Sequence, residues 1–248
     1  SRRTHNVQTL LTQYKIEKQA AGDKSVSPTN TRIGSKDAKI HGGSYIIPDE
    51  EYAEFMKKVK TATLGGQYEY LTEKQLTEGP LAIDMDLHYD YEVEDRQHNK
   101  SHIDDLIDII CSKLNDMYVF NAEQNIICYV MQKPDVNRVK EKNITKDGVH
   151  LLMNIKMDRS AMKYLREQLL SSIPEVWDVP IVNTWGSVFD EGVMKGTTNW
   201  QLYGSQKPGN EMYKLKYMFE VSVDEDNQTE MEEVDVKTIN FDKYFPMF

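Results

Sequence analysis

Apolar residues recur at helical spacing in three stretches of the chain. Tyr52, Phe55, Met56 and Val59 occupy positions i, i+3, i+4 and i+7, directly after Pro48 and a run of acids. The same spacing recurs over residues 103–117 and 162–169, and Asp158 is a candidate N-cap for the last. These stripes predict three amphipathic helices that face a core. A shorter helix is expected around residues 7–20.

Between these helices lie runs with the two-residue period of a strand. Over residues 81–88 the apolar side chains point one way, and Asp84, Asp86 and His88 point the other. The other strand-like runs are residues 126–131, 149–155, 200–205 and 212–221. Strands interspersed with helices predict an α/β or α+β fold, with helices packed on a sheet.

Composition and charge narrow the class of protein. The 248 residues are 39% hydrophobic and 28% charged, as is typical of a globular domain. No apolar run approaches the roughly 18 residues of a membrane helix, so no membrane partner is expected. The net charge of −10 argues against a general nucleic-acid coat, but residues 224–235 hold seven acids and no base, so a local basic groove is compatible with the rest. Cys111 and Cys128 lie in apolar contexts, which fits a reducing, intracellular compartment.

Three segments are expected along the chain. Residues 1–44 are polar and are predicted to form a helix and a basic loop, residues 45–223 a folded core, and residues 224–248 an acidic loop and the end of the chain. The N-terminal loop is either a solvated lead-in or an arm that touches a phosphate backbone through Arg32, Lys36 and Lys39. The start at Ser1 and the abrupt end at Phe248 lead us to expect a longer parent chain.

The strongest chemical signal is Asp84-Met85-Asp86. On a strand, residues i and i+2 place both carboxylates on one face, about 6–7 Å apart. Such a pair repels unless a cation lies nearby, and Mg²⁺ and Mn²⁺ prefer oxygen ligands. The pattern predicts a divalent-metal site, and the alternative is a solvated strand face with two ordinary acids.

Two later segments carry further polar groups. Gly148 directly precedes a strand that begins on a polar face with His150, where an imidazole could donate to a triphosphate. The bland alternative is a half-buried structural histidine. Residues 190–209 are rich in glycine and small polar side chains, with Asp190 as a candidate third acid and Ser205 and Lys207 as candidate phosphate donors. A surface hairpin is the alternative there.

Together these segments resemble the archaeo-eukaryotic primase pattern. The matching residues, in order, are Asp84 and Asp86, then Gly148-Val149-His150, then Asp190, and finally the segment from Asn199 to Lys207. The resemblance covers roughly residues 30–220 and is nearest to the N-terminal primase-polymerase domains of primase-helicases from nucleocytoplasmic large DNA viruses.

This resemblance implies a catalytic core with an RNA-recognition-like sheet joined to a second α/β unit. It implies a nucleotidyltransferase, a DNA-directed primase or polymerase in which two Mg²⁺ or Mn²⁺ ions serve transfer of an NTP or dNTP on a single-stranded DNA template and primer. Its implied metal ligands are Asp84, Asp86 and Asp190, and its nucleotide contacts are His150, Gly148, Asn199, Ser205 and Lys207. It also implies a helicase module in the same chain and action at viral replication sites in the host cytoplasm or nucleus.

The chain departs from this pattern at two positions. Thr198 and Gln201 stand where cellular relatives carry arginine, so two positive charges expected at a triphosphate site are missing. A second hypothesis is therefore a primase-like module that binds single-stranded DNA or docks to a helicase without catalysis. A third is another metal enzyme with an acid-x-acid pair, such as a glycosyltransferase, which His150 and the segment from Asn199 to Lys207 disfavour.

Overall fold

The chain divides into two compact units. The computed structural model describes residues 2–17, 25–120, 123–226 and 228–238. Among the described residues, the first unit comprises residues 2–17, 25–75 and 198–213, and the second comprises residues 76–120, 123–197, 214–226 and 228–238. In this division, residues on both sides of the boundary expected at residue 45 fall in one unit. The segment near residue 200 returns to the first unit because it pairs with residues 72 and 73, and no local sequence pattern predicts this pairing.

The first unit is a small antiparallel sheet with two helices. Its strand order is β2-β1-β3-β8. The strands are β1 (Asn30–Arg32), β2 (Gly43–Tyr45), β3 (Leu71–Glu73) and β8 (Trp200–Gln201), and the helices are α1 (Arg2–Gln13) and α3 (Asp49–Leu64). The predicted stripe of α3 is confirmed, because Phe55 and Val59 are buried and acids occupy the first turn, where the helix dipole favours them. Helix α1 ends earlier than expected, since Lys15 already pairs with Tyr45 in a β-bridge.

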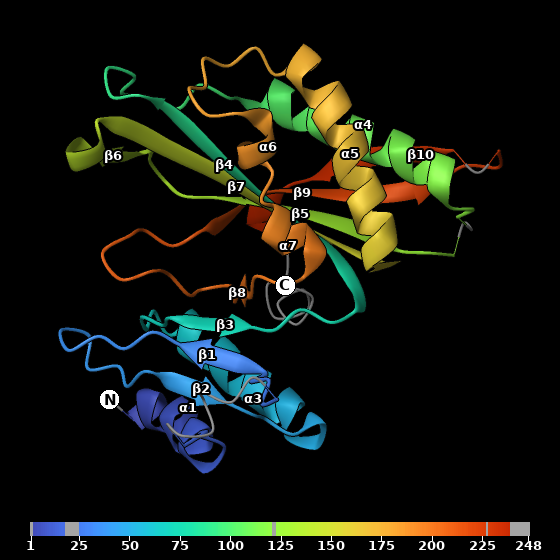
Figure 1. Cartoon of the computed structure of the whole chain (residues 1–248). Helices are drawn as coiled ribbons and strands as arrows, with labels where there is room; N and C mark the ends of the chain where they lie inside the picture. The colour runs from blue at the N-terminus through green and yellow to red at the C-terminus, as the bar shows by residue number, and fades with distance from the viewer. Residues whose placement is uncertain (1, 18–24, 121–122, 227, 239–248) are drawn as a thin grey trace. The chain divides into compact units, whose positions relative to one another are not determined.

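The second unit is built on a six-stranded antiparallel sheet (Figure 1). Its order is β10-β9-β5-β7-β4, and β6 pairs with β7. The strands are β4 (Glu78–Asp90), β5 (Ile126–Gln132), β6 (Asn137–Val139), β7 (Ile144–Asp158), β9 (Lys214–Val223) and β10 (Thr229–Val234). Alternation along β4 is as predicted: Leu81, Ile83, Met85 and Leu87 are fully buried.

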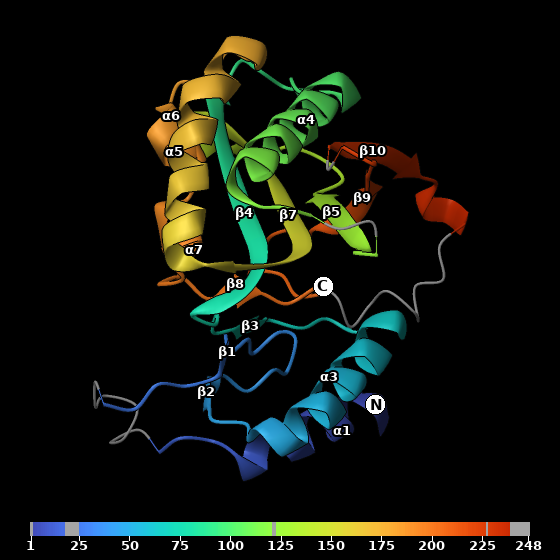
Figure 2. The ribbon, with the colours of Figure 1, turned by 90° about the vertical axis from the view of Figure 1, so that its right-hand side faces the viewer.

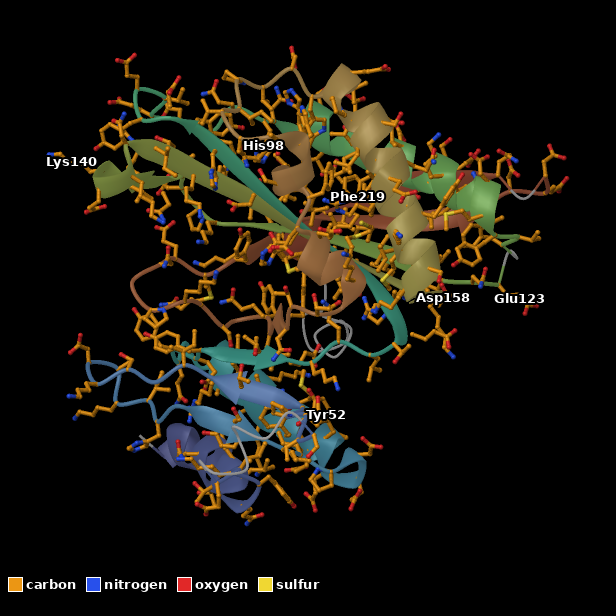
Figure 3. All side chains as sticks on the ribbon, in the orientation of Figure 1. Tyr52, His98, Glu123, Lys140, Asp158 and Phe219 are labelled. Carbon is orange, nitrogen blue, oxygen red and sulfur yellow. The ribbon has the colours of Figure 1, made fainter. Side chains whose placement is uncertain are left out.

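Helices α4 (Lys100–Met117) and α5 (Arg159–Val176) cover one face of this sheet (Figure 2). Their apolar stripes and the inward residues of the strands form one core, which includes Phe219 of β9 (Figure 3). The predicted N-cap is confirmed, because the Asp158 carboxylate accepts a hydrogen bond of 2.8 Å from the backbone N–H of Ala161. Short helices α6 (Trp185–Val188) and α7 (Glu191–Lys195) and the 3₁₀ turns η1 (Lys140–Lys142) and η2 (Val236–Thr238) complete the described elements. No described helix is long and apolar enough to cross a bilayer.

Two sequence-based assignments are wrong. Residues 229–234 form β10 rather than part of a solvated loop, because an edge strand tolerates outward-facing acids. The strand expected at residues 200–205 ends at Gln201, and the chain turns at Gly204, whose φ of 84° is a left-handed conformation. A side chain at Gly204 would also collide with Thr63 of α3.

Candidate active site

The polar face of β4 and β7 carries the predicted chemical groups in paired positions. Asp84 lies directly across from His150, and Asp86 lies across from Gly148. One rung further along, His88 faces Lys146. These five side chains share the sheet face opposite α4 and α5, because the alternating residues Met85 and Leu87 enter the core. The register thus joins two of the predicted segments into one site.

Protonatable and positively charged groups contact both carboxylates. His150 Nε2 lies 3.3 Å from Asp84 Oδ1, and His88 Nε2 lies 3.1 Å from Asp86 Oδ2. Lys146 Nζ lies 3.7 Å from the same Asp86 oxygen. The side chains of Asp84 and Asp86 are 26% and 44% exposed, so solutes can reach them. Gly148, which is itself buried, contributes no side chain to the position across from Asp86.

Asp190 is adjacent to this pair through the backbone. Its N–H donates a hydrogen bond of 2.9 Å to the carbonyl oxygen of Asp84, and Met85 forms an antiparallel bridge with Phe189. The Asp190 side chain caps α7, since Oδ1 accepts a 2.9 Å hydrogen bond from Val193 N. The structure therefore brings Asp190 beside the strand of the other two acids.

The carboxylates of Asp84 and Asp86 fit a hard divalent ion in their chemistry. Both are oxygen donors on one accessible strand face, which suits Mg²⁺ or Mn²⁺. Within the described ranges, no group of three His, Cys, Asp or Glu side chains is gathered so that it could hold an ion. Asp190 instead caps α7. Two of the three predicted ligands, Asp84 and Asp86, therefore fit a divalent ion in their chemistry. The metal site is a proposal.

A buried ion pair supports the β7 side of the site. The Asp147 carboxylate, 1% exposed, binds Arg96 through bonds of 2.8 Å and 2.9 Å and also accepts from Gly148 N. His98 lies beside them, with Nδ1 3.5 Å from Asp147 Oδ2, and its ring stacks on Trp177. Burial lowers the pKa of His98, against the attraction of Asp147. The pair fixes the backbone two residues before His150.

The remaining predicted nucleotide contacts belong to the first unit. Asn199 Nδ2 donates to Thr72 Oγ1 over 3.3 Å, and Lys207 is exposed in a loop after Gly204. Ser205 differs from expectation: it is buried, and its hydroxyl accepts a hydrogen bond of 3.1 Å from Leu71 N. It therefore ties the loop to β3.

The three predicted nucleic-acid contacts differ in their surroundings. Lys36 and Lys39 are exposed at the tip of a tight turn closed by the bridge between Ser35 and Ile40. Arg32 does not lie in that loop. It is on β1, where its side chain is 1% exposed and pairs with Glu69. The expectation of a solvated Arg32 was wrong, because the sequence does not reveal its distant partner.

Comparison with known proteins identifies the family to which this chain belongs. Residues 36–219 match the family described as the C962R protein N-terminal AEP domain, where AEP denotes the archaeo-eukaryotic primases. The chain belongs to this AEP family. It is also 26% identical over 172 residues to a curated protein of Acanthamoeba polyphaga mimivirus named "Putative helicase L207/L206". That alignment covers 68% of this chain and 18% of the mimivirus protein.

The match includes most of the predicted site of this AEP domain, from Lys36 to Lys207, and leaves Arg32 outside. Sequence reasoning missed Arg96 and Asp147, and it noted His88 without assigning it a role. Alternation along residues 81–88 already put His88 on the face of Asp84, so that signal was available. No local signal connects Arg96 with Asp147, because fifty residues separate them.

Proposed function

We propose that this AEP domain is a metal-dependent nucleotidyltransferase that synthesises or extends primers on single-stranded DNA. The observation that carries the proposal is the β4–β7 register, which sets His150 across from Asp84 and links Asp190 to the same strand. The order of these groups matches the primase pattern, and the family membership favours this chemistry over the glycosyltransferase alternative.

In the proposed reaction, this chain mainly positions groups and balances charge. Asp84 and Asp86 would hold Mg²⁺ or Mn²⁺, and Asp190 would serve as the third ligand on releasing its cap on Val193 N. Bound ions of this kind activate an attacking 3′-hydroxyl and neutralise the leaving pyrophosphate. His150 would donate to the triphosphate of the incoming nucleotide. Asn199 and Lys207 are nucleotide contacts by the resemblance to the primase pattern alone.

A lysine beside the acids supplies part of the positive charge that is missing at Thr198 and Gln201. Lys146 lies 3.7 Å from Asp86 and so stands where phosphate charge is expected. Lys195 is the weaker candidate, because its Nζ lies 2.7 Å from Glu191 on the same short helix. We assign Lys146 the role that Thr198 and Gln201 cannot fill.

We further propose that the parent chain couples this domain to a helicase and acts in viral DNA replication. The support is the helicase named in mimivirus, of whose length this chain spans 18%. The template and primer are single-stranded DNA in this proposal, and the substrates are NTPs or dNTPs.

The second candidate function is a catalytically inactive module that binds single-stranded DNA or docks to a helicase. Thr198 and Gln201 favour it, because they remove charge from the nucleotide site. A primer-synthesis assay with labelled nucleotides separates the two. Nucleotidyl transfer predicts products that require Mg²⁺ or Mn²⁺ and disappear in Asp84→Asn and His150→Ala. DNA binding without products in either metal would favour the module.

A further inference from the structure

The outer edge of β4 is covered by a segment that includes the short helix α6 rather than by another strand. β4 ends the strand order of its sheet, and residues 182–190 run along its far side. Val182 N donates to His88 O over 2.8 Å, and Asp190 N donates to Asp84 O over 2.9 Å. Edge strands present unpaired backbone groups and are prone to local opening. This segment therefore holds the edge where the two acids lie.

One side chain in this segment replaces a peptide group. Asn183 Oδ1 accepts a hydrogen bond of 3.1 Å from His88 N, and Asn183 Nδ2 donates one of 2.9 Å to Asp86 O. A carboxamide offers the same donor and acceptor as the backbone of a paired strand. Asn183 thus fixes the backbone of both Asp86 and His88.

A second side chain fixes the far end of the segment. Arg166 of α5 donates through Nη2 to Gly186 O over 2.8 Å and to Phe189 O over 3.0 Å. Phe189 is fully buried and directly precedes Asp190. The guanidinium therefore holds the backbone directly before Asp190, whose own N–H binds Asp84 O.

We propose that Asn183 and Arg166 are positioning residues of the acid site. Asn183 holds Asp86 on its strand, and Arg166 holds Asp190 against Asp84. The inference rests on the proposed function, since it assumes that the acids bind a divalent ion. Such a site requires carboxylates held to within about 0.5 Å, and loss of supporting contacts around metal ligands costs about tenfold to a hundredfold in metal affinity.

The test is Mn²⁺ binding to the whole chain by isothermal titration calorimetry without nucleotide, together with thermal unfolding. Asn183→Ala should weaken Mn²⁺ binding at least about tenfold. Arg166→Met should do the same, and Arg166→Lys, which keeps one donor, should fall between. In primer extension, kcat should fall with little change in KM for the template.

Thr184→Ala is the matched control in the same segment. It removes the hydroxyl that accepts from Ser187 N at the start of α6, and so loosens the segment without touching the backbone of Asp86. Wild-type Mn²⁺ affinity in folded Asn183→Ala and Arg166→Lys, with melting shifts like that of Thr184→Ala, would overturn the proposal. Asp84→Asn and Asp86→Asn separate the two failures: if these variants also bind Mn²⁺ normally, the metal site itself is wrong.

Discussion

Replacing Arg32 should destabilise the first unit rather than weaken DNA binding directly. Its guanidinium meets the Glu69 carboxylate through bonds of 2.7 Å and 2.8 Å, and Nη1 donates to Gln8 over 2.6 Å. The side chains of Arg32 and Glu69 are 1% and 5% exposed. Glu69 also accepts from Tyr70 N, so the pair joins β1 to the start of β3.

Arg32→Ala leaves the Glu69 carboxylate buried without its counter-charge. Breaking a buried pair by removing one partner costs about 3–5 kcal/mol, a large part of the roughly 5–15 kcal/mol of a typical domain. Urea unfolding followed by circular dichroism should show this loss. The double variant Arg32→Met with Glu69→Leu should recover most of it, since paired apolar replacements are often close to neutral.

Lys36→Ala is the matched control, because this exposed turn residue should change stability by less than about 0.5 kcal/mol. The reasoning would be refuted if Arg32→Ala kept wild-type stability while it lost affinity for a single-stranded oligonucleotide. That outcome would restore Arg32 as a phosphate contact.

Three further expectations follow from described contacts. Binding of single-stranded DNA should weaken with salt, with a slope near −0.7 per phosphate contact, and Lys36→Ala with Lys39→Ala should flatten it; an unchanged slope would remove this turn from the interface. Because burial lowers the pKa of His98, the unfolded chain binds a proton near pH 6.5 that the folded chain binds only at lower pH. The free energy of unfolding should therefore fall below about pH 6.5, by up to about 1.4 kcal/mol per pH unit, and His98→Gln should lose that part of the dependence; equal slopes in urea titrations would contradict this. Asp158→Ala should cost about 1 kcal/mol, because the cap on Ala161 N is lost, and Asp158→Ser should restore most of it; equal stability of all three proteins would disprove the cap.

Local patterns predicted the parts of this fold that local physics determines. Alternation along β4 assigned Asp84 and Asp86 to one face and Met85 to the core, as the structure has them. Helix spacing and the cap at Asp158 were confirmed for the same reason, since they depend on residues within one turn.

The features that could not be predicted from the sequence depend on contacts between residues that are far apart along the chain. The rung between Asp84 and His150 is set by the register of two strands about sixty residues apart, and a one-residue slip would send His150 to the other face. The burial of Arg32 likewise depends on Glu69, which no periodicity connects to it. Glu230 and its acidic neighbours suggested a loop, yet pairing with β9 makes them an edge strand.

The most direct test of the central claim is single-turnover nucleotide incorporation on a primed single-stranded template in Mn²⁺. Asp86→Asn is compared with Asp90→Asn, a variant of the exposed acid four residues further along β4 on the same face. The account predicts that Asp86→Asn reduces incorporation to background while Asp90→Asn and the wild type incorporate alike, with all three proteins equally folded. Near wild-type incorporation by Asp86→Asn would contradict the proposed metal site.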